Sequence, residues 1–180
     1  MYGLRLFRKH KISKDGTDLE DETADNLWFI LSKYPELGSM FQAGRISTIE
    51  VRPRINRVAP DAILTSVGGT RTMVEVKVGA WAEVSVEQLT KYQALCDELG
   101  IKRLVLLTDR DHSHLDAPGL IRLTWSDVHD FIAYELKRQP NAWLLEEWLH
   151  YQEAEHSRIH YINHFRDTLT VVKSETGTFS

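Results

Sequence analysis

The residues best suited to chemistry lie in and beside two short apolar segments between positions 59 and 80. Asp61 lies near the start of the first segment, while Glu75 and Lys77 lie within the second. Two converging carboxylates can bind a hard cation such as Mg²⁺, which takes one or two protein carboxylates together with water and substrate phosphate. An adjacent ammonium group can hold an attacking water or offset charge that develops on a phosphate. These residue types therefore indicate metal-dependent chemistry on a phosphate ester.

The two apolar segments are expected to form a β-hairpin that brings these groups together. Both are rich in β-branched residues, and Gly68-Gly69 can supply the positive φ angles of a two-residue turn. Side chains alternate along a strand, so Glu75 and Lys77 share one face, opposite a face made entirely of valine. A half-buried charged pair costs desolvation free energy and needs a reason. An ordinary ion pair on a solvent-facing strand is the alternative interpretation of Glu75 and Lys77.

The larger pattern resembles a known family. Pro60-Asp61, the hairpin and then Glu75-Val76-Lys77 resemble the signature of the PD-(D/E)xK nuclease superfamily, which shares the core of type II restriction enzymes. The resemblance extends over residues 19–108, a little over half of the chain. It includes the segment from Gln88 to Tyr92, expected on a helix, which looks like the Gln-x-x-x-Tyr motif of the RecB-like branch.

The resemblance implies a role for each of these residues. Asp61 and Glu75 would hold one or two Mg²⁺ or Mn²⁺ ions, with the carbonyl of Val76 as a further ligand. Lys77 would orient the attacking water, and Gln88 would steady the lysine or the substrate backbone. The implied activity is metal-dependent hydrolysis of phosphodiester bonds in nucleic acid, with DNA as the expected substrate. Restriction, phage defence, repair and processing of mobile elements all remain open as contexts.

Two helices are expected to place further side chains at this site. The segment from about Val84 to Leu99 has helical spacing and ends at Gly100. Gln88 and Tyr92 are one turn apart on it and can point to the same place, although an ordinary core aromatic is an equal interpretation of Tyr92.

Related nucleases often carry an accessory acid as well. Glu22, in the first turn of a helix over residues 19–33, and Glu50, in a strand over residues 46–52, are the two candidates. Acidic residues also favour helix starts for electrostatic reasons alone. The sequence does not choose between Glu22 and Glu50.

Basic residues follow the strand that contains Glu50. Arg52, Arg54 and Arg57 precede Asp61 and suit contacts with phosphates near a cleavage centre, while a solvated connection is equally consistent with them. The formal net charge of -4 does not mark a general nucleic-acid binder. Any such contact must therefore come from local basic clusters, or from a partner in a larger complex that supplies DNA affinity.

Composition bounds the class of protein. With 180 residues, 42% of them hydrophobic and 27% charged, a single soluble domain over residues 1–180 is expected. The lone Cys96 excludes an internal disulfide and a cysteine-ligated cluster, and it falls on an apolar helix stripe, so we expect a buried small side chain. No segment resembles a signal peptide or a membrane span, and we expect a cytoplasmic protein without membrane contact.

The predicted fold is an α/β, restriction-endonuclease-like core in the order helix, three strands, helix, strand. The apolar run over residues 102–108 predicts a strand buried on both faces, parallel to an earlier strand, which makes the central sheet mixed and flanked by helices. A last short strand over residues 119–123 and a helix capped by Thr124 or Ser126 follow. The core is expected over about residues 19–124 and a C-terminal helical extension over about 125–170.

The C-terminal part offers other interpretations. A long helix, or two in succession, over about residues 141–169 could pair with a second copy in a homodimer, and His156, His160 and His164 line one of its faces. We interpret these histidines as a surface or interface stripe, and the segment with His112 and His114 as a solvated loop. The alternatives to a nuclease are a non-catalytic module that binds nucleic acid or protein on the same fold, and a helix-mediated dimerisation protein.

Overall fold

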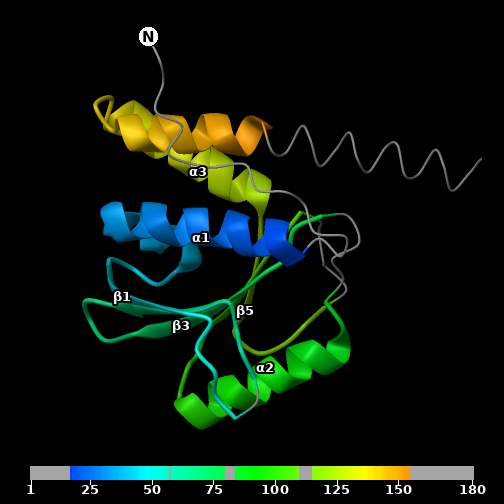
Figure 1. The fold of residues 1–180 in the computed structure, drawn as a ribbon. Helices are drawn as coiled ribbons and strands as arrows, with labels where there is room; N and C mark the ends of the chain where they lie inside the picture. The colour runs from blue at the N-terminus through cyan, green and yellow to red at the C-terminus, as the bar shows by residue number, and fades with distance from the viewer. Residues whose placement is uncertain (1–16, 57, 80–83, 110–114, 155–180) are drawn as a thin grey trace, which may run out of the picture.

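The computed structural model describes residues 17–56, 58–79, 84–109 and 115–154 (Figure 1). Its elements in chain order are α1 (Thr17–Lys33), the 3-10 helix η1 (Pro35–Phe41), β1 (Ile46–Val51), β2 (Ala62–Ser66), β3 (Arg71–Val76), α2 (Val86–Leu99), β4 (Leu104–Thr108), β5 (Leu120–Thr124) and α3 (Trp125–Arg138). Residues 143–154 are also helical. The predicted α/β order of helix, three strands, helix, strand and a last short strand is confirmed.

The five strands form one mixed sheet in the order β1-β2-β3-β4-β5. β1, β2 and β3 pair antiparallel, whereas β4 is parallel to β3 and β5 is parallel to β4. The connection from β3 through α2 to β4 is therefore the predicted strand, helix, strand crossover. β3 lies in the middle of the sheet, where both of its neighbours hold it in place.

Helices cover both faces of this sheet (Figure 1). α1, α3 and the helical residues 143–154 lie over one face, and Leu27, Val76 and Trp148 belong to the buried cluster there. α2 lies over the other face, where Met73 and Leu95 belong to a second cluster. All five residues of β4 are buried, as expected for a strand covered on both faces.

Local signals explain where the helices begin and end. α2 begins after Ser85, whose side chain accepts a hydrogen bond from Gln88 N–H, so the helix starts at Val86 rather than at the predicted Val84. It ends at Gly100, which has a φ of 65°. Of the two predicted caps for α3, Thr124 takes the role.

The turn of the β2–β3 hairpin differs from the prediction of two residues. Ser66 N–H donates to the Thr70 carbonyl at 2.8 Å, so residues 67–69 form a three-residue loop. Of the two glycines only Gly69 has a positive φ, 78°, which is the arrangement expected of such a loop. The Ser66 hydroxyl accepts a hydrogen bond from Thr70 N–H at 3.0 Å and so stabilises the longer turn.

Cys96 is buried on α2, with Sγ 3.7 Å from Sδ of Met73. Burial raises the pKa of its thiol to about 11. The thiol therefore stays protonated and packs as a small apolar group, as predicted.

Several predictions fall on residues outside the described part of the chain. They concern Arg57, the loop histidines His112 and His114, the stripe of His156, His160 and His164, and the rest of the C-terminal helix. Within the residues described, no helix combines the length and the apolar composition needed to cross a bilayer.

Candidate active site

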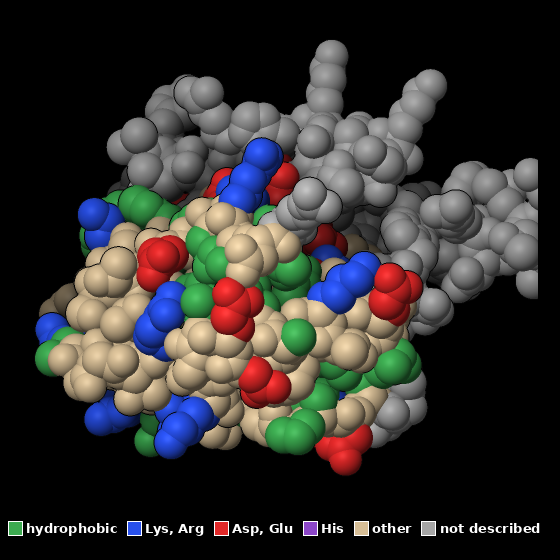
Figure 2. All heavy atoms as spheres, turned by 90° about the horizontal axis from the view of Figure 1, so that it is seen from below, with side chains coloured by type: hydrophobic (Ala, Val, Ile, Leu, Met, Phe, Trp, Pro, Cys, Tyr) green, Lys and Arg blue, Asp and Glu red, His purple; other side chains and the backbone are tan. Residues whose placement is uncertain are grey.

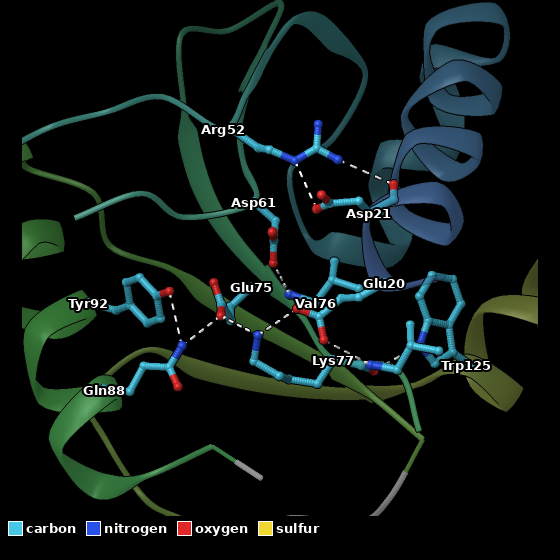
Figure 3. A network of polar contacts seen from close by, with 11 residues as sticks. Glu20, Asp21, Arg52, Asp61, Glu75, Val76, Lys77, Gln88, Tyr92 and Trp125 are labelled. Atoms are coloured by element: carbon cyan, nitrogen blue, oxygen red, sulfur yellow. Dashed lines mark hydrogen bonds and ion pairs between the residues drawn. The ribbon is translucent and has the colours of Figure 1, made fainter. Parts of the chain in front are cut away.

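Asp61 and Glu75 face each other where β3 ends. The antiparallel register pairs Ala62 with Val74, so Asp61 and Glu75, one residue further along each strand, lie opposite each other on the face that α2 covers. Oδ2 of Asp61 accepts a hydrogen bond from Val76 N–H at 2.7 Å (Figure 3). An extended residue directs its N–H and C=O to the same side. The Val76 carbonyl therefore also lies on the Asp61 side of β3.

Glu75 is a buried carboxylate, only 3% exposed. Its Oε1 lies 2.8 Å from Nζ of Lys77 and accepts a hydrogen bond from Nε2 of Gln88, also at 2.8 Å. Its Oε2 is buried and makes no hydrogen bond of normal length among the described residues, although the Tyr92 hydroxyl is near enough to the carboxyl to lower the pKa of Glu75. The alternative of a solvent-facing strand with an ordinary ion pair is therefore wrong, because β3 is central and α2 covers this face.

The environment of the two acids disfavours their charged forms. Burial, and after it the charge of Asp61, raise the pKa of Glu75 to about 7, although Lys77 opposes the change. Burial also raises the pKa of Asp61, against the opposing hydrogen bond from Val76 N–H. A cation between them would remove the repulsion and favour both carboxylates.

Lys77 is held by two carboxylates. Its Nζ lies 2.8 Å from Glu75 and 2.9 Å from Oε1 of Glu20 on α1 (Figure 3). Burial alone would lower the pKa of the ammonium, but the two carboxylates outweigh it and raise that pKa. Its backbone is held as well, since the Lys77 carbonyl accepts a hydrogen bond from Nε1 of Trp125 at 3.2 Å. Lys77 is therefore a fixed, protonated donor at neutral pH.

The acid that α1 brings to the site is Glu20, which the sequence reasoning missed. Glu22, one of the two candidates for the accessory acid, has Oε1 3.4 Å from the hydroxyl of Tyr151 instead. Glu50, the other candidate, lies on β1 with Oε1 3.9 Å from Arg71. Helical spacing contained a signal for Glu20, because it continues the buried stripe formed by residues 24, 27 and 31.

Gln88 and Tyr92 meet at the site, as their spacing predicts. Nε2 of Gln88 donates to the Tyr92 hydroxyl at 3.1 Å as well as to Glu75. Gln88 therefore contacts the carboxylate of the site rather than the lysine side chain. Tyr92 is 6% exposed and its ring belongs to the core beneath α2. Tyr92 is therefore a core aromatic whose hydroxyl also reaches the site. Burial raises the pKa of its hydroxyl, which stays protonated.

Arg52, one of the predicted phosphate contacts, pairs with α1. Its guanidinium lies 3.1 Å from Asp21 and 2.9 Å from Asp25, and its backbone N–H donates to the Asp61 carbonyl at 2.9 Å. The side chain therefore ties α1 to the strand end that carries Asp61. Arg54 is exposed.

We expect Arg52→Gln to lower the free energy of unfolding by about 1 kcal/mol, a small loss because both ion pairs are largely exposed. The matched variant Arg54→Gln should leave stability unchanged. Urea denaturation of the two variants in EDTA measures the difference. Equal stabilities would show that the pairing of Arg52 with α1 contributes nothing.

The side chains present fit an ion that prefers oxygen ligands better than one that prefers nitrogen or sulfur ligands. Among the described residues there is no group of three or more His, Cys, Asp and Glu side chains that could enclose a metal. Asp61, Glu75 and the Val76 carbonyl supply only oxygen, the ligand type that Mg²⁺ and Mn²⁺ prefer. Mg²⁺ completes its shell with water and substrate, so two carboxylates suffice.

No protein-family model matches this chain, and no curated protein matches its sequence. The resemblance to a nuclease family therefore depends on the motif residues and on their arrangement.

Proposed function

We propose that this protein is a metal-dependent nuclease that hydrolyses phosphodiester bonds of DNA. In this proposal the fold is a restriction-endonuclease-like core and the chain is similar to the PD-(D/E)xK superfamily. The element order, the central hairpin and the α2 residues Gln88 and Tyr92 support the assignment.

The observation that carries the proposal is the buried, unpartnered Oε2 of Glu75 beside Asp61. A carboxylate oxygen withdrawn from water without a hydrogen bond costs free energy. A protein that needed Glu75 only as an ion-pair partner for Lys77 would gain nothing from this arrangement. A divalent cation that binds Asp61, Glu75 and the Val76 carbonyl gives the unpartnered oxygen a ligand role.

The residues of the chain have separate tasks in hydrolysis. Asp61 and Glu75 would hold the ion, which would activate water and offset phosphate charge. Lys77, fixed by Glu75 and Glu20, donates a hydrogen bond to the attacking water or to a phosphate oxygen. It does not act as a base, because its raised pKa keeps it protonated. Gln88 holds the Glu75 carboxylate in position.

A direct assay tests the proposal. Purified protein is incubated with single-stranded, duplex and branched DNA and with RNA, in the presence of Mg²⁺, Mn²⁺ or EDTA. We expect cleavage of DNA with either ion and none in EDTA. Binding without cleavage under every condition would contradict the proposal and favour a non-catalytic binding module.

The pKa of Glu75 predicts how ion binding depends on pH. The ion binds the deprotonated carboxylate, and half of the Glu75 side chains are protonated at about pH 7. Affinity for Mn²⁺ should therefore rise with pH up to about 7, by up to about tenfold per unit, and then level off. Calorimetric titration with Mn²⁺ below and above this pH measures the change. Affinity that is flat with pH would contradict the proposed role of Glu75.

A further inference from the structure

A polar hollow lies at the end of β3 away from the candidate active site. It has a volume of about 390 Å³ and is lined by Gly69, Thr70, Arg71, Gly100, Lys102 and Arg103. Arg71 begins the strand that carries Glu75, and the four residue steps from Arg71 to Glu75 span about 13 Å. The hollow is therefore separate from the candidate active site.

The hollow exists because two turns meet there. The β2–β3 loop ends at Gly69 and Thr70, and α2 ends at Gly100 before the chain enters β4. Gly69 and Gly100 both have positive φ and lack side chains, and the space that a Cβ would occupy at either is open. Two glycine turns thus leave room between the hairpin loop and the end of α2.

Three cationic side chains line this space with little neutralisation. The guanidinium of Arg71 lies 3.9 Å from Oε1 of Glu50. Within the described residues, Lys102 and Arg103 form no ion pair. The chain has 26 acidic residues and a net charge of -4, so a shortage of acids is not the cause. Figure 2 views the molecule from the α2 side and shows Lys and Arg side chains gathered on the left, the end where the β2–β3 loop lies in Figure 1.

We propose that this hollow binds the phosphate group of a nucleotide unit. Guanidinium groups bind phosphate oxygens in bidentate fashion, an ammonium adds a point charge, and the Thr70 hydroxyl can donate a hydrogen bond. The volume lies in the range of small-molecule sites and exceeds what a bare phosphate needs. The phosphate comes either from a nucleic-acid strand or from a free nucleotide, and both present the same chemistry to the three cations.

A binding experiment without catalysis tests this site independently of the proposed nuclease activity. The full chain, labelled with ¹⁵N and kept in EDTA, is titrated with inorganic phosphate and, at equal ionic strength, with chloride. The amide signals of Gly69, Thr70 and Gly100 should shift saturably with phosphate only. Lys102→Gln combined with Arg103→Gln should weaken this binding at least about tenfold, because charge-assisted hydrogen bonds are lost. Lys137→Gln on the exposed side of α3 is the matched control and should bind phosphate normally.

A second arm identifies the source of the phosphate. Binding of a labelled short DNA is measured over a range of salt in the same variants. A salt dependence reduced by about one unit of slope per lost contact assigns the hollow to a nucleic-acid strand. Unchanged DNA binding together with lost phosphate binding assigns it to a free nucleotide. Equal responses to phosphate and chloride, or unchanged phosphate binding in the folded single variant Lys102→Gln and in the double variant, would overturn the proposal and leave the cations as partners of the α2 C-terminus.

Discussion

Replacing Lys77 with methionine is expected to reduce metal-dependent DNA cleavage by about 10²- to 10³-fold, the usual cost of removing one donor to a transition state. Methionine keeps much of the volume of the buried stem but removes the ammonium that Glu75 and Glu20 hold. The loss should appear in the rate at saturating substrate and metal, because the charge acts on the reacting groups. Single-turnover cleavage with Mg²⁺ or Mn²⁺ measures it.

The matched control is Lys91→Met on α2. Lys91 also pairs with a glutamate, Glu87, at 2.8 Å, but both side chains are exposed. This variant should cleave at the normal rate. If both variants cleave alike, Lys77 has no part in the chemistry and the proposed mechanism fails.

Replacing Glu75 with glutamine should have opposite effects on metal binding and on stability. Affinity for Mn²⁺ should fall by about 100-fold or more, since even residues behind a metal ligand contribute up to that amount. Cleavage should be lost with it. In EDTA at pH 8, by contrast, the free energy of unfolding should rise, by as much as about 3 kcal/mol.

The stability effect follows from proton linkage. The pKa of Glu75 is raised from its ordinary 4.5 to about 7 in the folded protein, so the folded state holds this proton to higher pH than the unfolded chain does. Metal-free protein therefore loses stability as pH rises from about 4.5 to about 7. Glutamine resembles the protonated form and removes this loss. Chemical denaturation of both proteins at pH values on either side of this window measures the difference.

Glu87→Gln serves as the control, because this glutamate is fully exposed on α2. It should leave metal affinity unchanged and should not raise the free energy of unfolding in EDTA at pH 8. A Glu75→Gln protein that is less stable than the parent in EDTA at pH 8 would show that the ion pair with Lys77 outweighs the burial of the charge.

These two predictions have one physical origin. Asp61, Glu75 and Lys77 lie in a central part of the sheet where apolar side chains would pack with less desolvation. Buried charged groups that reduce stability are most often retained for function. Stability and activity should therefore change in opposite directions at Glu75.

The order of the elements and the two faces of β3 follow from local patterns in the amino-acid sequence. Alternation along a strand is a local property, so Glu75 and Lys77 had to share a face wherever the hairpin packed. Helical spacing is equally local, and it predicted that Gln88 and Tyr92 would meet. The motif residues lie on elements that follow one another in the chain. Their arrangement could therefore be predicted from the sequence.

Contacts between elements that are distant in the chain depend on tertiary packing and could not be predicted from the sequence. The rotation of α1 against the sheet brings Glu20, and not Glu22, to Lys77, from which it is separated by 57 positions in the chain. The same packing pairs Arg52 with α1. Burial of Glu75, and with it the raised pKa, requires α2 to close over the central strand. Such contacts depend on how whole faces fit together, and no spacing within one segment encodes that fit.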